Sequence, residues 1–172
     1  MSTIRTDVDH VESGNWVFSG TVSLPANSIN ENNLTTAALL PAAKLVARFA
    51  KDHRQASGTA VVAKTELIHI AKYAGIVKSV EAAIDDAITG DNTVVIDIKK
   101  STGGAAFATI LSSTLTINSS SAAQTALAAT VDATKDDYIA GDVFEVVVTV
   151  AGSGTQAQGL NVTVFFEENP TS

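Results

Sequence analysis

Apolar and polar side chains alternate with a period of two residues along the last two thirds of the chain. In TVVIDIKK (93–100), Ile96 and Ile98 fall on one face. Asp97 and Lys99 fall on the other face. Such alternation is typical of a β-strand that packs one face on a core and exposes the other to water. The segments that we expect to be strands are 65–71, 75–84, 93–100, 105–112, 115–118, 126–131, 142–150 and 159–168.

The connections between these strands are rich in Gly, Ser, Asn and Asp, and no segment with helical periodicity lies between them. STGG (101–104) has the composition of a tight turn and predicts a hairpin. AGSGTQAQG (151–159) is expected to form the hairpin loop between the last two strands. Parallel sheets need long crossover connections, usually helices. We therefore expect an all-β fold, an antiparallel β-sandwich that is jelly-roll-like with about eight strands.

Some positions depart from simple alternation. Lys78 interrupts the pattern of GIVKSVEAAI, which indicates a β-bulge or a strand edge. In TELIHIA we expect Ile68 and Ile70 to share one face. Four apolar side chains fall on faces that should be exposed, and such faces either become subunit interfaces or lie under a loop. These four side chains belong to Ala126, Ala128, Val147 and Phe165.

The N-terminal third differs from the rest of the chain. NWVFSGTVSLPANSI (15–29) favours an extended conformation, but no other strand pattern lies near it in the sequence. One short helix is expected at residues 42–51, where Leu45, Val46 and Phe49 fall on one side. A single strand and a short helix cannot bury a core of their own. This part of the chain must pack on the β-domain or on another chain.

Charge is distributed unevenly, which supports a boundary near residue 56. Residues 1–56 carry five basic and five acidic groups, whereas residues 57–172 carry six basic and thirteen acidic groups and so the whole net charge of −7. We therefore expect an N-terminal arm or attachment segment (1–56) and a β-sandwich domain (57–172). An acidic body argues against nucleic-acid binding, which needs basic groups that displace counterions. A basic cluster of Lys44, Arg48, Lys51 and Arg54 is either a solvated face or docks on an acidic partner.

Composition narrows the class of protein further. The hydrophobic fraction of 45% and the mean hydropathy of +0.22 suffice for a packed core. The absence of Cys excludes disulfides, thiolate zinc sites and Cys nucleophiles. No run approaches the roughly 18 apolar residues of a membrane span, and MSTIRTDVDH lacks the apolar stretch of a secretory signal. We expect a protein without a membrane partner that is made in the cytoplasm.

Candidate chemistry is sparse. The three histidines, His10, His53 and His69, are far apart in the sequence, and we expect them at the surface or in the core rather than on a metal. Glu66 and Glu81 could form a glycosidase pair, although nothing favours it. GxSxG and a phosphate-binding loop are absent. Two acidic loops could bind calcium but are better explained as solvated turns; their carboxylates are Asp85, Asp86, Asp91, Asp132, Asp136, Asp137 and Asp142. We expect no enzymatic activity and no cofactor.

Three stretches of the chain resemble tailed-bacteriophage virion structural proteins. They are FSGTVSLPANSI, DIKKSTGGAAFATILSS and VVVTVAGSGTQAQGLNVTVFFEENP. The likeness spans most of the chain and consists of strand and turn patterns. The proteins that it points to are capsid decoration (cement) proteins and head-fibre-like β-sandwich proteins.

The resemblance implies a role without catalysis. The arm would attach to the virion and bind the major capsid protein, and the sandwich would project from the outer capsid surface, often as a homotrimer. The residues that we expect to bind the partner are Trp16, Phe18, Val22, Leu24, Lys44, Arg48 and Lys51. The alternative is a tail-fibre, head-fibre or baseplate component whose β-sandwich binds a host surface glycan.

Overall fold

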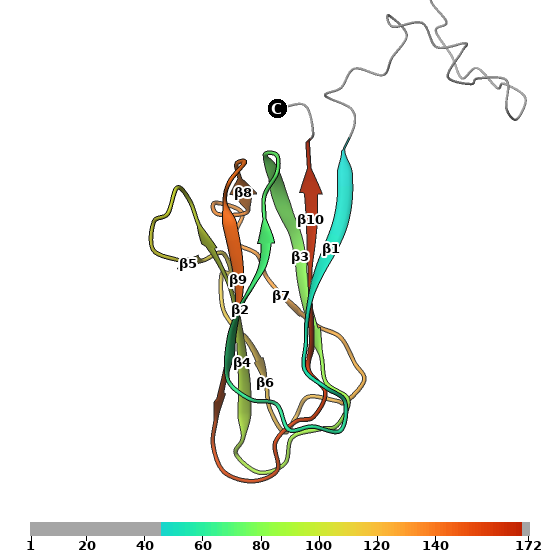
Figure 1. The fold of residues 1–172 in the computed structure, drawn as a ribbon. Coiled ribbons are helices and arrows are strands. Elements are labelled where there is room, and N and C mark those ends of the chain that lie inside the picture. Colours follow the sequence, from blue (N-terminus) through green and yellow to red (C-terminus); the bar gives the residue numbers. More distant parts are fainter. Residues whose placement is uncertain (1–45, 170–172) are drawn as a thin grey trace, which may run out of the picture. The chain divides into compact units, whose positions relative to one another are not determined.

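The computed structural model describes residues 46–169, which form ten strands and no helix (Figure 1). The described residues therefore include no helix that could span a membrane. The strands are β1 (Ala47–Arg54), β2 (Lys64–Ile70), β3 (Gly75–Ala83), β4 (Thr93–Ser101), β5 (Ala108–Thr109), β6 (Leu115–Ile117), β7 (Leu127–Ala129), β8 (Asp137–Tyr138), β9 (Val143–Ala151) and β10 (Asn161–Glu168).

The strands form two antiparallel sheets, as the alternating pattern predicted. The β10 sheet has the order β1-β10-β3-β7, with β8 also paired to β3. The β9 sheet has the order β2-β9-β4-β5, with β6 also paired to β4. In the described part of the chain, β1 and β2 each form one edge of their sheet, and they contact each other.

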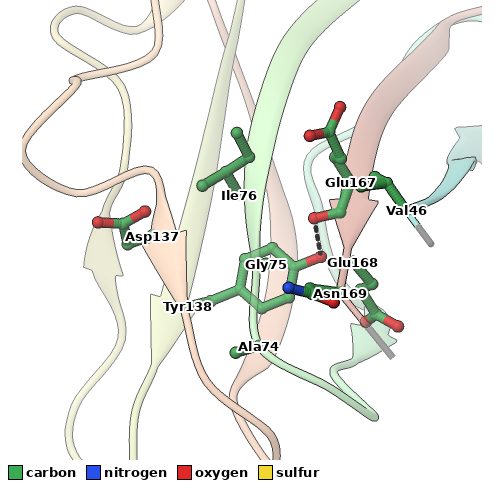
Figure 2. Close-up of a pocket in the computed structure, with 9 residues that line it drawn as sticks. All are labelled: Val46, Ala74, Gly75, Ile76, Asp137, Tyr138, Glu167, Glu168 and Asn169. Atoms are coloured by element: carbon green, nitrogen blue, oxygen red, sulfur yellow. Dashed lines mark hydrogen bonds between the residues drawn. The ribbon is translucent and has the colours of Figure 1, made fainter. Parts of the chain in front are cut away.

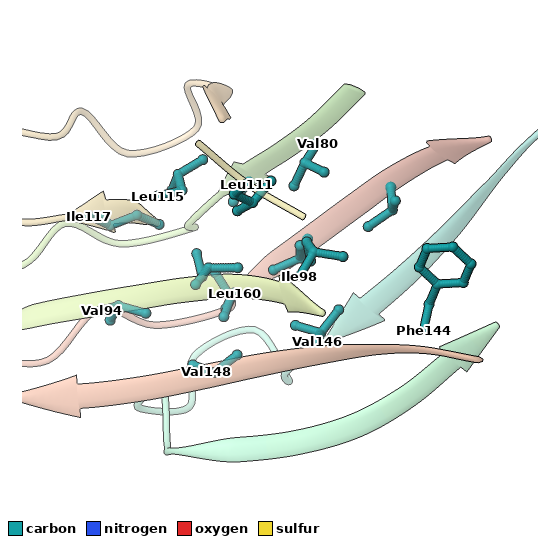
Figure 3. Close-up of a cluster of buried hydrophobic side chains, with 14 of the residues drawn as sticks. Val80, Val94, Ile98, Leu111, Leu115, Ile117, Phe144, Val146, Val148 and Leu160 are labelled. Atoms are coloured by element: carbon teal, nitrogen blue, oxygen red, sulfur yellow. The ribbon is translucent and has the colours of Figure 1, made fainter. Parts of the chain in front are cut away.

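The core lies between the two sheets and is built from the positions that alternation assigned to it (Figure 3). Val94, Ile96 and Ile98 of β4 have no exposed surface, while Asp97 and Lys99 are half-buried on the other face. Phe144, Val146, Val162, Val164 and Phe166 are also buried. Full burial of one such side chain contributes about 1.5–3 kcal/mol, so this face-to-face packing is the main source of stability.

The helix expected at 42–51 is wrong for residues 47–51, which belong to β1; residues 42–45 lie outside the described part. In ARFAKDHR the apolar residues fit a helical stripe, and only Ala47 and Phe49 also fit a two-residue alternation. In β1, Phe49 lies opposite Phe166 and His53 lies opposite Val162 of β10. Pairing with β10 buries His53 and half-buries Phe49, and this tertiary packing overrides a weak helix propensity. Residues 47–56, which we had assigned to the arm, are therefore part of the sandwich.

Two further expectations about strands need correction. Residues 151–159 do not form a hairpin loop, because β9 and β10 lie in different sheets and the loop crosses between them. Ile68 and Ile70 do not share a face. The register of β2 against β9 shifts between Leu67 and His69, so Ile68 packs against the core while Ile70 points outward and is 66% exposed.

Gly152, in the crossing loop, is a position where only glycine fits. Its φ is +97°, and an added Cβ would overlap the carbonyl oxygen of Asp91. We expect Gly152→Ala to lower the free energy of unfolding by about 2–4 kcal/mol, from backbone strain plus overpacking. Urea denaturation followed by circular dichroism measures this loss.

Gly103, in the β4–β5 turn, provides the matched control for this substitution. It also has a positive φ, +60°, but no atom lies within 4 Å of its added Cβ. We expect Gly103→Ala to cost about 1 kcal/mol, from backbone conformation alone. Equal losses at the two glycines would show that contact with the Asp91 loop contributes nothing to stability.

Candidate functional site

The structure places two of the seven expected partner-binding residues, and both lie on β1. Arg48 points to the outer face of the β10 sheet, opposite Glu167 of β10, and its side chain is 79% exposed. Lys51 lies opposite the buried Val164 and so starts from the inner side of the edge strand. Its Nζ extends to 5.7 Å from the ring centre of Phe49. The other five residues, Trp16, Phe18, Val22, Leu24 and Lys44, lie outside the described residues.

A shallow groove of about 570 Å³ crosses the outer face of the β10 sheet beside Arg48. Three adjacent strands form it: β1, β10 and β3. The side chain of Phe165, at the middle strand, is 37% exposed. Ala50 lies opposite Phe165 on β1, and Ser79 lies opposite it on β3. The centre of the groove is therefore apolar and is flanked on both sides by small residues.

A β-bulge shapes one wall of this groove. Phe165 pairs with Ser79 and Phe166 pairs with Val77, so Lys78 is an extra residue on β3. The irregularity at Lys78 in the sequence indicated a bulge or a strand edge. Of these two the bulge is the one observed, because β3 lies inside its sheet. A bulge leaves one residue unpaired and re-aims its side chain. Lys78 is exposed at the groove as a result.

Two cations and one carboxylate set the charge of the groove. Arg48 Nε donates a hydrogen bond to Glu167 Oε2 at 3.0 Å. Lys78 has no hydrogen-bond or ion-pair partner within residues 46–169. The groove thus has a net positive charge on a chain whose net charge is −7. It is an isolated basic and apolar site on an acidic protein.

Inside the sandwich, two His–Glu pairs join the sheets along the β1–β2 side. His53 Nδ1 of β1 lies 2.9 Å from Glu66 Oε2 of β2. His69 Nε2 of β2 lies 3.1 Å from Glu168 Oε1 of β10, and both of these side chains are buried. Lys64 Nζ is 2.7 Å from the Glu66 carboxylate. These hydrogen bonds, first from Lys64 and then from His53, hold the pKa of Glu66 below its usual value.

Both His–Glu pairs connect strands of opposite sheets. Within the described residues, no group of three or more His, Cys, Asp or Glu side chains could hold a metal ion. The two carboxylates considered as a glycosidase pair, Glu66 and Glu81, lie in different sheets and face different sides.

Glu66 is opposite the buried Val146 and faces the interior. Glu81 is in the other sheet and faces outward with Thr163. The two carboxylates flank no common space.

A second hollow, of about 400 Å³, lies at the end of the sandwich beside the start of β3 and the end of β10 (Figure 2). Tyr138 crosses it, and the Tyr138 hydroxyl donates to the carbonyl oxygen of Glu167 at 3.5 Å. Burial raises the pKa of Tyr138, and the negative charges of Glu168 and Glu167 raise it further. Tyr138 therefore stays neutral and acts as a packing residue and hydrogen-bond donor.

Several carboxylates in the acidic loops accept hydrogen bonds from nearby backbone N–H groups and so stabilise turns. Asp91 Oδ1 accepts hydrogen bonds from the backbone N–H and the hydroxyl of Ser153, and these lower the pKa of Asp91. The pKa of Asp132 is lowered to about 2, first by the backbone N–H of Thr134. Asp142 Oδ2 accepts from the backbone N–H of Ile139 at 3.1 Å. These three carboxylates are therefore turn-forming groups. Asp91 is exposed, as expected for a solvated turn, whereas Asp142 is buried and departs from that expectation.

No protein-family model, curated protein or solved structure matches the chain.

The groove was only partly visible in the sequence. Lys78 and Phe165 each gave a signal, the first as an irregularity and the second as an outward-facing aromatic. Arg48 was assigned to the arm, so nothing joined it to the other two. A strand over ARFAKDHR would place Arg48 and Ala50 on one face, but Ala50 and Lys51 break the apolar–polar alternation that marks a strand in the sequence.

Proposed function

We propose that this chain is a non-enzymatic structural protein of a tailed-bacteriophage virion. As a decoration (cement) protein it binds the major capsid protein at the outer capsid surface and stabilises the shell. It assembles there as a homotrimer after synthesis in the host cytoplasm. The jelly-roll-like connectivity, which the strand and loop pattern suggests, belongs to the same proposal. So does the attachment role of the N-terminal residues, which the resemblance implies.

The observation that carries the proposal is the groove beside β1. A decoration protein must attach to many identical sites through complementary surfaces, and exposed aromatic and Arg side chains are enriched at protein–protein interfaces. Phe165 and Arg48 meet this description on the outer face of the β10 sheet. A stable interface of this kind buries about 1,600 Å² in total.

The proposal predicts where the protein is found and what its loss does. In cryo-EM maps of purified particles we expect many symmetry-related copies on the capsid. We expect particles that lack the protein to release DNA at a lower temperature, because bound copies stabilise the assembled state by mass action. Thermal release of DNA, followed with an intercalating dye, measures this shift.

Deletion of residues 1–45 separates attachment from folding. Because β1 begins at Ala47, the shortened chain keeps all ten strands of the described sandwich and should show a cooperative unfolding transition. We expect it to add back poorly to depleted particles. A few copies at the tail, with loss of adsorption to cells when they are removed, would contradict the proposal and favour a glycan-binding fibre or baseplate protein.

A further inference from the structure

We propose that the groove formed by β1, β10 and β3 is a docking site for an extended acidic peptide segment of a partner protein, with two carboxylates on either side of one apolar side chain. The inference rests on the proposed function in taking the partner to be a protein. It is tested below with isolated peptides, so its outcome does not depend on the virion.

The apolar part of the ligand is set by the centre of the groove. Phe165 leaves more than a third of its surface in contact with water although the strands around it are well packed. Ala50 and Ser79, which flank it, are small enough to leave room above the sheet. A volume of about 570 Å³ accepts one aliphatic side chain with the neighbouring backbone. Covering Phe165 with a Leu or Ile side chain removes apolar surface of both partners from water.

The positions of Arg48 and Lys78 determine where the two acidic side chains of the peptide should lie. Arg48 on β1 and Lys78 on β3 lie on opposite sides of β10. Neighbouring strands are about 4.8 Å apart, so these cations start about 10 Å apart and reach outward from there. In an extended peptide, residues i and i+4 lie on the same side about 13 Å apart, with residue i+2 between them. The expected pattern is therefore acidic-x-apolar-x-acidic.

Both Arg48 and Lys78 have N–H donors available to bind a carboxylate of the ligand. Lys78 has no partner within the described residues, so a ligand carboxylate meets no competitor there. Arg48 bonds to Glu167 through Nε. A guanidinium has five N–H donors, so Arg48 can keep this bond and donate to a second carboxylate. Glu167 contributes the one negative charge in the groove and fixes the orientation of Arg48.

The charge of the rest of the protein makes the site selective. With a net charge of −7, the chain repels acidic segments over most of its surface, and like-charge contacts disfavour wrong placements. Two cations are too few to hold a nucleic acid, which needs many phosphate contacts. A short acidic segment with an apolar anchor matches both the number of cations and the exposed aromatic ring.

The test is a titration of the ¹⁵N-labelled full-length protein with acetyl-Glu-Ser-Leu-Ser-Glu-amide, followed by NMR. We expect saturable shifts of the β1, β10 and β3 amides around Ala50, Phe165 and Ser79, with a Kd of about 1 mM, as for a small interface. The affinity should fall as salt is added. The peptides Lys-Ser-Leu-Ser-Lys and Glu-Ser-Gly-Ser-Glu, capped in the same way, should bind at least about tenfold more weakly.

Variants locate the site. Lys78→Glu and Phe165→Ser should each weaken peptide binding about tenfold or more, while spectra with native dispersion show that the fold is kept. Lys72→Glu makes the same charge change in the loop before β3, where Lys72 contacts only the Tyr73 ring among the described residues. It should leave the affinity within about twofold.

Three results would overturn the proposal. One is no saturable shift up to about 10 mM peptide, which is ten times the expected Kd. Another is equal binding of the basic peptide. The third is a set of groove shifts that depends on the concentration of the protein alone, which would assign the groove to a second copy of this chain. Peptide binding in a protein that proves absent from virions would leave the docking site standing and remove the proposed function.

Discussion

Phe166→Ala is expected to lower the free energy of unfolding by about 3–5 kcal/mol, the usual cost of removing a buried aromatic side chain. Phe166 is 1% exposed and lies at the centre of an aromatic cluster between the sheets. Its ring is stacked on Phe49 with centroids 5.4 Å apart, and it meets Phe144 edge-on at 5.1 Å. His69 lies 4.7 Å away. The substitution therefore removes contacts between β10 and three other strands.

The neighbouring Phe165 is the matched control because it has the same side chain on the same strand but faces outward. We expect Phe165→Ala to change the free energy of unfolding by less than about 1 kcal/mol, as for an exposed substitution. Chemical denaturation curves with equal slopes would give both values. Similar losses for the two variants would contradict the assignment of Phe166 to the core and Phe165 to the groove.

His69→Leu is expected to destabilise the sandwich by about 3 kcal/mol, because it leaves the Glu168 carboxylate buried without its partner. The side chains of His69 and Glu168 are 9% and 7% exposed, and they join β2 of one sheet to β10 of the other. Desolvating a charged group costs free energy unless a hydrogen bond compensates for it. Equilibrium denaturation at neutral pH measures the loss.

Two variants test the reason for this loss. Glu168→Gln keeps an acceptor for His69 Nε2, and we expect it to cost about 1 kcal/mol, the net worth of an ordinary hydrogen bond. The double variant His69→Leu/Glu168→Leu removes both polar groups and should recover much of the stability lost in the single variant. The single variant Glu168→Leu completes the cycle. A double variant as unstable as the sum of His69→Leu and Glu168→Leu would show that the pair is uncoupled.

Much of the sandwich could be predicted from local patterns. The faces of β4, β9 and β10 follow from alternation because one side of each strand is buried and the other is not. The STGG turn is confirmed as the connection between β4 and β5, which pair as a hairpin. It works because Gly103 and Gly104 both adopt positive φ.

What could not be predicted depends on contacts between distant residues. ARFAKDHR fits both a helix and a strand, and pairing with β10, more than a hundred residues later, decides between them. The loop 151–159 contains hairpin residues, yet its end glycine, Gly159, packs on Asp85 and the loop crosses to the other sheet. The histidines gave no pattern because each partner glutamate lies on a strand of the opposite sheet. The groove likewise combines three strands that are not consecutive in the chain.

Two edge strands of the sandwich, β1 and β2, each carry a lysine on their inner side, Lys51 and Lys64, opposite the buried Val164 and Val148. A strand added to either edge from another molecule would extend the sheet and trap that ammonium group away from water. Inward-pointing charge at an edge is a recognised barrier to amyloid-like sheet extension. The lysines therefore oppose sheet extension from another molecule at the β1 and β2 edges.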